Sequence, residues 1–121
     1  MLTKKDIERL YGKVTTNKYG NTKVKTNVGV FDSQKEFTRY CQLIYLERAK
    51  EIKNLQRQVR YELIPKTHYG RAIYYVADFV YEEKGKIVVE DVKSEATKTP
   101  VYKLKKRLLA EKYNIVITEI T

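Results

Sequence analysis

Cysteine, tryptophan and proline are scarce in this chain of 121 residues, which has one Cys, no Trp and two Pro. The single cysteine, Cys41, cannot form an internal disulfide, and its place on the apolar side of a predicted helix favours a core residue over a nucleophile. No run approaches the roughly 18 apolar residues of a membrane span, and the first residues lack the apolar core of a signal peptide. We therefore expect a cytoplasmic protein with no membrane segment.

Acidic residues are also few, because 15 Asp and Glu stand against 25 Lys and Arg, which gives a net charge of +10. Such an excess favours a polyanionic partner, with nucleic acid ahead of an anionic membrane surface. The length suits one domain with a modest core. We therefore expect a single domain over residues 1–121, in which residues 1–25 form a basic N-terminal helix and arm that could wrap DNA or order on dimerisation.

Local signals place two helices in the chain. Ser33 followed by Glu36 is typical of a capping box, and the apolar spacing after it predicts a helix to about Glu51. Thr99 before Pro100 predicts the start of a second helix, which ends near residues 113–114. Its apolar face is expected to hold Val101, Leu104 and Leu108. Three further segments read as strands or hairpin arms: 24–31, 58–64 and 115–120. Together with the hairpin below, they predict an α/β fold around one mixed sheet.

Two carboxylates lie in the strongest strand pair of the sequence. Asp78 and Asp91 each sit in a run rich in Val, Ile, Tyr and Phe, and Lys84-Gly85 between the runs has turn chemistry. A two-residue turn there pairs Glu83 with Lys86 and, further along, sets Asp78 opposite Asp91. Like charges at that spacing destabilise a sheet. Some positive group should therefore lie between or beside them.

Side chains repeat every second residue along a strand, so Lys93 should emerge on the same face as Asp91 while Glu90 points away. Two acids and one base then converge, and a divalent cation between the carboxylates would remove their repulsion. Mg²⁺ typically binds through one or two carboxylates plus waters and phosphate oxygens. The alternative is a pair of surface aspartates with an ordinary salt-bridged lysine, although Asp78 interrupts an apolar strand where an unpartnered carboxylate is costly.

The order of these residues resembles the PD-(D/E)XK nuclease superfamily, and in particular small phage and prophage proteins related to Holliday junction resolvases. The segments that carry the resemblance are Phe31-Asp32-Ser33-Gln34-Lys35-Glu36, Tyr61-Glu62-Leu63-Ile64-Pro65, Ala77-Asp78-Phe79 and Val89-Glu90-Asp91-Val92-Lys93. One departure is Ala77, which stands where the superfamily name implies proline. The resemblance implies a restriction-endonuclease-like α/β core, a central mixed sheet flanked by helices, and Mg²⁺-dependent phosphodiester hydrolysis in which Mn²⁺ substitutes.

That resemblance also implies roles for single residues. Asp78, Asp91 and the backbone carbonyl of Val92 would hold Mg²⁺, and Lys93 would orient the attacking hydroxide or stabilise charge on the phosphate. Glu36 would assist through water-mediated metal contacts or a second metal, although its capping box alone explains a Glu at that position. By resemblance only, Gln58 would position water or substrate; the alternative is a plain amide at a strand edge.

Basic residues cluster after the paired acids and could track a phosphate backbone: Lys98, Lys103, Lys105, Lys106 and Arg107. Alternatively, these basic residues only form the solvent-exposed face of the helix and contact no phosphate. The resemblance thus implies a Mg²⁺-dependent DNA endonuclease of the resolvase-like kind that acts on branched DNA, and cutting a junction would need a two-fold dimer. A non-catalytic nucleic-acid-binding or host-inhibiting protein on the same fold, and a passive DNA-binding structural protein, remain as alternatives.

Overall fold

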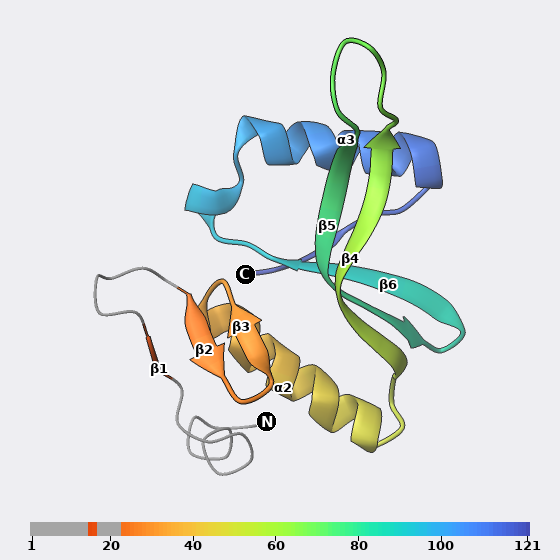
Figure 1. The fold of residues 1–121 in the computed structure, drawn as a ribbon. Helices are drawn as coiled ribbons and strands as arrows, with labels where there is room; N and C mark the ends of the chain where they lie inside the picture. Colours follow the sequence, from red (N-terminus) through yellow and green to blue (C-terminus); the bar gives the residue numbers. More distant parts are fainter. Residues whose placement is uncertain (1–14, 17–22) are drawn as a thin grey trace. The chain divides into compact units, whose positions relative to one another are not determined.

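The structure is a computed structural model that describes residues 15–16 and 23–121. The chain divides into two compact units, Met1–Glu51 and Ile52–Thr121, and each is described by itself (Figure 1). Most of the basic N-terminal helix and arm expected over residues 1–25 lies outside the described residues. The single domain expected over 1–121 stays a prediction.

The described residues of the first unit form three short strands and one helix. Strands β1 (Thr15–Thr16), β2 (Val24–Thr26) and β3 (Gly29–Phe31) pair antiparallel in the order β1-β2-β3. The segment 24–31 was expected as one strand or hairpin arm, and is instead a hairpin of two short strands. Helix α2 (Gln34–Arg48) follows, and ends three residues before the expected Glu51.

Helix α2 begins as the sequence predicts and buries its apolar side. The Ser33 hydroxyl accepts a hydrogen bond from the Glu36 backbone N–H at 3.0 Å, which satisfies one of the amides at the start of the helix. Phe37 and Cys41 are fully buried in one cluster with Phe31. Burial raises the pKa of the Cys41 thiol to about 11. The predicted role of Cys41 as a core residue rather than a nucleophile is therefore confirmed.

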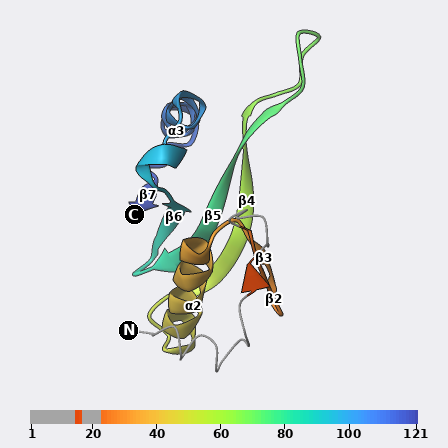
Figure 2. The ribbon, with the colours of Figure 1, turned by 90° about the vertical axis from the view of Figure 1, so that its left-hand side faces the viewer.

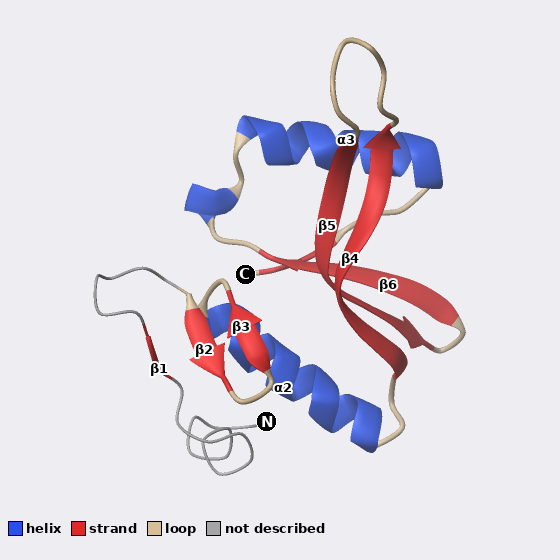
Figure 3. Cartoon of the chain, in the orientation of Figure 1, coloured by secondary structure: helices blue, strands red, loops and turns tan. Residues whose placement is uncertain are grey.

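The second unit is a mixed four-stranded sheet with one long helix (Figure 3). The strands β4 (Lys53–Ile64), β5 (Ile73–Glu83), β6 (Lys86–Val92) and β7 (Thr118–Ile120) lie in that order, antiparallel except for the parallel pair β6 and β7. A short 3₁₀ turn, η1 (Glu95–Thr97), leads into helix α3 (Pro100–Tyr113), which Figure 2 shows nearly end-on beside the sheet. The predicted α/β class with a mixed sheet is confirmed.

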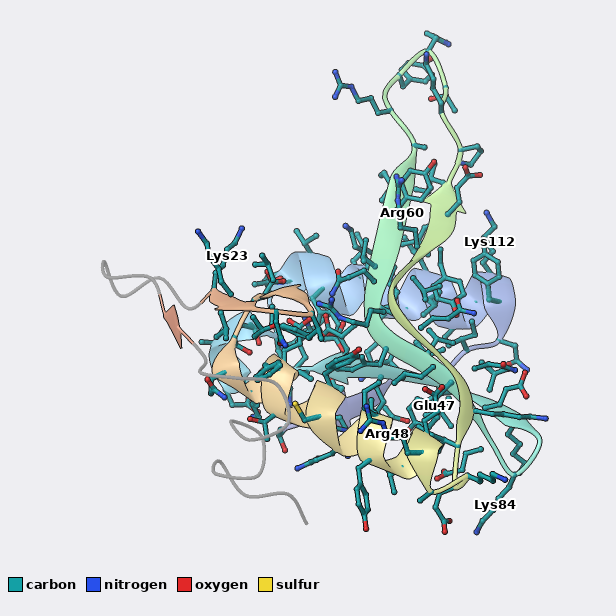
Figure 4. All side chains as sticks on the ribbon, turned by 60° about the horizontal axis from the view of Figure 1, so that its bottom comes forward. Lys23, Glu47, Arg48, Arg60, Lys84 and Lys112 are labelled. Atoms are coloured by element: carbon teal, nitrogen blue, oxygen red, sulfur yellow. The ribbon has the colours of Figure 1, made fainter. Side chains whose placement is uncertain are left out.

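The turn between β5 and β6 falls where the sequence places it. Glu83 pairs with Lys86, and Lys84 and Gly85 take φ values of 53° and 77°, as a two-residue hairpin turn of the favoured hand requires. Lys84 projects from the tip of this hairpin in Figure 4. The turn fixes the register of every residue pair that follows along the two strands.

Helix α3 also begins as predicted, since the Thr99 hydroxyl accepts from the Tyr102 backbone N–H at 3.1 Å. Its buried face is different from the expected one. Tyr102 and Leu109 are buried in the core of the second unit, whereas Val101 and Leu104 are 62% and 58% exposed. The expectation of Val101 and Leu104 as core residues was wrong because the large ring of Tyr102 sets the rotation of the helix.

In the part of the chain that the structure describes, no helix is both long and apolar enough to cross a membrane.

Candidate functional site

Asp78 lies where the β5–β6 ladder stops. The backbone pairing runs from Glu83–Lys86 as far as Phe79–Glu90, and the next position along this register is Asp78 with Asp91. At this position a side-chain hydrogen bond replaces the backbone pairing: Asp78 Oδ2 accepts from the Val92 backbone N–H at 2.8 Å. The two strands therefore bring both aspartates to the same end of the hairpin.

The alternation of strand β5 breaks at this point. Ala77 and Val80 belong to the same core cluster although they are three residues apart, a spacing that puts side chains on opposite faces of a regular strand. The irregularity falls on Asp78 and Phe79. Local breaks of this kind re-aim side chains next to functional sites.

Gln58 occupies the matching position on strand β4. Its neighbours Arg57 and Val59 pair with Phe79 and Ala77, so Gln58 lies across from Asp78, and its amide donates to Asp78 Oδ1 at 3.5 Å. Gln58 also has a φ of 53° inside a twelve-residue strand. A non-glycine residue in the left-handed region is strained, and such strain gathers at functional sites.

Asp91 is buried and held by two donors. Tyr75 donates its hydroxyl to Asp91 Oδ2 at 2.6 Å, and the Lys93 ammonium lies 3.1 Å from Asp91 Oδ1. The side chains of Asp91 and Lys93 are only 3% and 18% exposed. The prediction that Lys93 shares a face with Asp91 is confirmed. So is the opposite orientation of Glu90, which is fully buried and accepts a hydrogen bond from the Tyr81 hydroxyl.

The charges of Asp78 and Asp91 both help to raise the pKa of two tyrosines, Tyr75 and Tyr102. Burial, together with the charges of Asp91 and Asp78, raises the pKa of the Tyr75 hydroxyl far above its ordinary value. Burial, the hydrogen bond to Glu119 and the same two aspartates raise the pKa of Tyr102. Each tyrosine therefore remains a neutral hydrogen-bond donor.

Glu119 on strand β7 places a third carboxylate next to Asp91. It pairs with Asp91 in the parallel register of β6 and β7, and its Oε2 accepts from the Tyr102 hydroxyl at 2.7 Å. Its Oε1 lies 3.3 Å from the Lys106 ammonium. The hydrogen bond from Tyr102 is the main cause that lowers the pKa of Glu119. Sequence reasoning missed this residue because parallel pairing between distant strands leaves no local pattern.

A cavity of about 300 Å³ opens beside these groups. It is lined by the buried pair Asp91 and Lys93, by Tyr75 and Tyr102, and by side chains from the start of α3 and the turn before it. The Lys93 ammonium also lies 4.5 Å from the centre of the Tyr102 ring, a cation–π contact that restrains its position. The cavity thus offers a cation and a carboxylate on the same wall.

The predicted basic residues divide into two groups around this cavity. Lys106 and Lys98 approach Glu119 Oε1 at 3.3 Å and 4.0 Å, so they offset its charge. Lys105 lines the cavity, whereas Lys103 and Arg107 lie exposed on α3. The latter three are better placed than the former two to meet an external anion.

Glu36 belongs to the first unit and is described there alone. It is buried, and its Oε2 accepts a hydrogen bond from the Asp32 backbone N–H at 3.1 Å. The expected capping box is therefore present in a modified form, with the carboxylate reaching the residue before Ser33. Its assignment to catalysis stays a prediction.

The donor set suits a hard divalent cation. Across residues 15–16 and 23–121 there is no cluster of three or more His, Cys, Asp or Glu side chains of the kind that holds a metal by itself. Mg²⁺ does not require one, because it takes one or two carboxylates and completes its shell with water and phosphate oxygens. Each oxygen of Asp78 and Asp91 accepts one described donor, and a carboxylate oxygen has room for a further partner. The oxygens of both aspartates are thus of the donor type that Mg²⁺ takes, and magnesium binding here stays a prediction.

Fold and site together define a small α/β protein. Its partly buried carboxylates, Asp78, Asp91 and Glu119, lie on neighbouring strands, with the strained Gln58 beside Asp78 and helix α3 nearby. The chain belongs to the family described as "Protein of unknown function (DUF1064)", whose model matches residues 16–120. Neither the curated proteins nor the solved structures contain a match.

Proposed function

We propose that this protein is a Mg²⁺-dependent endonuclease of the PD-(D/E)XK type that hydrolyses phosphodiester bonds in DNA. The observation that carries the proposal is the ion pair of buried Asp91 with half-buried Lys93 at the wall of a cavity, beside Asp78 and the strained Gln58. Removing a charged pair from water is costly, and apolar residues in its place are often at least as stable. A catalytic role would explain the presence of the pair.

Each residue of the site has a defined task in this proposal. Asp78, Asp91 and the Val92 carbonyl would hold Mg²⁺, which when bound polarises the phosphate and makes water more acidic. Lys93 lies 3.1 Å from Asp91 and presents a compact positive charge to the phosphate oxygen that becomes more negative during attack. Tyr75 fixes the orientation of the Asp91 carboxylate through its hydroxyl. Gln58 positions Asp78 and the water beside it.

The surface around the site supports a nucleic-acid substrate. Lys103 and Arg107 are exposed one turn apart on α3, Lys105 lies on another face of the helix at the cavity, and the whole chain carries a net charge of +10. We infer that the enzyme acts in the cytoplasm, where cellular and phage DNA lie. Action on a four-way junction would need two sites related by two-fold symmetry, and therefore a homodimer.

A second candidate is a protein that binds nucleic acid without cutting it. Lys93 and Tyr75 hold Asp91 by an ion pair and a hydrogen bond, contacts that a purely structural carboxylate would also make. The two candidates differ in one respect that can be measured. Only the nuclease requires Mg²⁺ and the Asp91 charge for a covalent change in the DNA.

The test is cleavage of a labelled four-way junction, a matched linear duplex and a single strand, with Mg²⁺ or with EDTA. We expect Mg²⁺-dependent cutting that Asp91→Asn reduces by about 10³-fold, since the variant keeps the shape and the hydrogen bond from Tyr75 but loses the charge. Glu83→Gln is the matched control, because Glu83 is an exposed carboxylate on the same hairpin. Binding of all three substrates without any cutting would leave only the second candidate.

A further inference from the structure

The β4–β5 hairpin extends well beyond the rest of the second unit. In Figures 1 and 2 its closed end, with the loop between the two strands, stands clear of α3 and of β6. Residues 64–71 are all exposed. The sheet core does not need this extension, because the buried residues of β5 begin at Tyr75.

The tip of the hairpin is an ordered two-residue turn. Thr67 and Gly70 exchange backbone hydrogen bonds of 3.0 Å and 3.2 Å, and the Thr67 hydroxyl accepts from the Tyr69 backbone N–H at 3.2 Å. The two turn residues are His68 and Tyr69, whose ring centres lie 4.0 Å apart. Turns favour Gly, Asn, Asp, Ser and Pro, so turn chemistry does not explain an aromatic pair there.

Tyr69 is 90% exposed, the largest exposure among the exposed large hydrophobic residues of the described chain. Leaving an aromatic ring in water forgoes the free energy that its burial would provide. The ring is held by its neighbour His68 on a turn closed by Thr67 and Gly70. A flat aromatic surface held ready in solvent is the arrangement on which an unpaired base stacks.

Positive charge flanks the aromatic pair on both strands. Lys66 precedes it and Arg71 follows it, and residues 64–73 contain no carboxylate. Further down the hairpin, Arg60 lies over the Tyr74 ring at 4.1 Å, and Figure 4 shows Arg60 on the protruding part of β4. Cationic side chains that alternate with aromatic rings fit a polyanion that carries flat bases.

We propose that the β4–β5 hairpin tip binds nucleic acid, with Tyr69 stacking on an unpaired base and Lys66 and Arg71 contacting the phosphates beside it. The inference deepens the proposed function by naming its substrate class, DNA with an unpaired or branched segment. Tyr69 precedes Asp78 by nine residues. An extended strand of that length spans at most about 30 Å, so the unpaired base would lie within roughly nine nucleotides of the cleaved bond.

The test measures binding in EDTA, so that it is independent of cleavage. Fluorescence anisotropy of the full chain is recorded with two labelled ligands, a duplex that contains a short single-stranded gap and the same duplex fully paired. We expect Tyr69→Ala to weaken binding of the gapped duplex by about tenfold and to leave the paired duplex within twofold, because stacking needs an unpaired base. Tyr69→Phe keeps the ring and should keep the affinity. With 2-aminopurine in the gap, the wild type should quench its fluorescence and Tyr69→Ala should not.

The matched control is Tyr45→Ala, which removes a tyrosine 59% exposed on α2 and should change neither affinity. Equal affinity of wild type and Tyr69→Ala for the gapped duplex overturns the inference, as does an equal loss on both ligands or the absence of any binding. Mg²⁺-dependent cutting together with an unaffected Tyr69→Ala leaves the nuclease standing without the hairpin contact. A selective loss of gapped-duplex binding without any cutting upholds the hairpin contact and removes the nuclease.

Discussion

Lys93 and Asp91 form an ion pair that would also carry the chemistry of the proposed nuclease. Asp91 is buried and Lys93 is half-buried, and Tyr75 donates to the carboxylate oxygen that Lys93 does not touch. A carboxylate in such a place needs compensating donors to remain charged. The donors that stabilise Asp91 are therefore the same groups that set its direction toward the cavity.

Lys93→Met, alone and combined with Asp91→Asn, should separate the effect of this ion pair on cleavage from its effect on stability. We expect cleavage to fall by at least 10²-fold and the free energy of unfolding to fall by about 1–3 kcal/mol, because Asp91 keeps only its tyrosine donor. In the double variant Lys93→Met/Asp91→Asn the unpaired charge is gone, so most of the lost stability should return while cleavage stays absent. Urea unfolding and the cleavage assay measure the two quantities; a double variant no more stable than Lys93→Met would contradict this account.

Sequence reasoning found the residues whose positions follow from local spacing. Asp91 and Lys93 are two apart in a strand, so their shared face could be read directly. Tyr75 and Glu119 could not be found in this way. Tyr75 reaches Asp91 only because the alternation of β5 breaks beyond Ala77, and Glu119 meets Asp91 only through a parallel pairing formed across α3.

At the scale of elements, strand β4 holds the clearest sign of a functional compromise. Gln58 is left-handed in the middle of the strand, at the position that faces Asp78. An ordinary residue loses roughly 1–2 kcal/mol in that conformation, whereas glycine adopts it freely. The backbone conformation of Gln58 therefore destabilises the strand at the position where its amide contacts the Asp78 carboxylate.

Replacing Gln58 by two small residues isolates this cost. Gln58→Gly and Gln58→Ala both remove the amide, and both should reduce cleavage by about tenfold or more. They differ in their tolerance of a φ of 53°, so Gln58→Gly should be more stable than Gln58→Ala by about 1 kcal/mol. Chemical denaturation of the two variants in parallel measures the difference. Equal stabilities would show that residue 58 relaxes out of the left-handed region.

The elements themselves were largely predictable because their ends carry strong local chemistry. Ser33 and Thr99 accept the first amides of their helices, and Lys84-Gly85 forms the expected turn. The start of β4 was missed because its first residues, from Lys53 to Arg57, are mostly polar. The buried face of α3 was predicted wrongly, because Val101 and Tyr102 are adjacent and both apolar enough for the core, and only Tyr102 is buried.

For the whole molecule, the excess of positive charge should appear as a strong dependence of DNA affinity on salt. Each phosphate contact contributes about 0.9 to the slope of log affinity against log salt for duplex DNA. Lys103→Ala should therefore lower the slope by about 0.9, and Lys106→Ala should lower it by less, because Glu119 already offsets the Lys106 charge.

Anisotropy titrations between 50 and 200 mM salt, about the range in which such contacts are lost, measure these slopes. EDTA should abolish cleavage and leave the slopes unchanged, since the metal is needed for the reaction and not for the charge contacts. The matched control is Lys112→Ala on the last turn of α3, where the ammonium lies over the Tyr113 ring. A slope lowered equally by the Lys103, Lys106 and Lys112 variants would show that α3 makes no localised contact.

The parallel pairing of β6 with β7 has a consequence for the order in which the protein assembles. The β5–β6 hairpin closes over two residues, and hairpins form on the order of microseconds. The pairing of Asp91 with Glu119 must wait until all of α3 has been made and has crossed the sheet. The strands that carry the two aspartates can therefore pair before Glu119 joins the sheet, so Glu119 and its hydrogen bond from Tyr102 are late additions to a hairpin that has already formed.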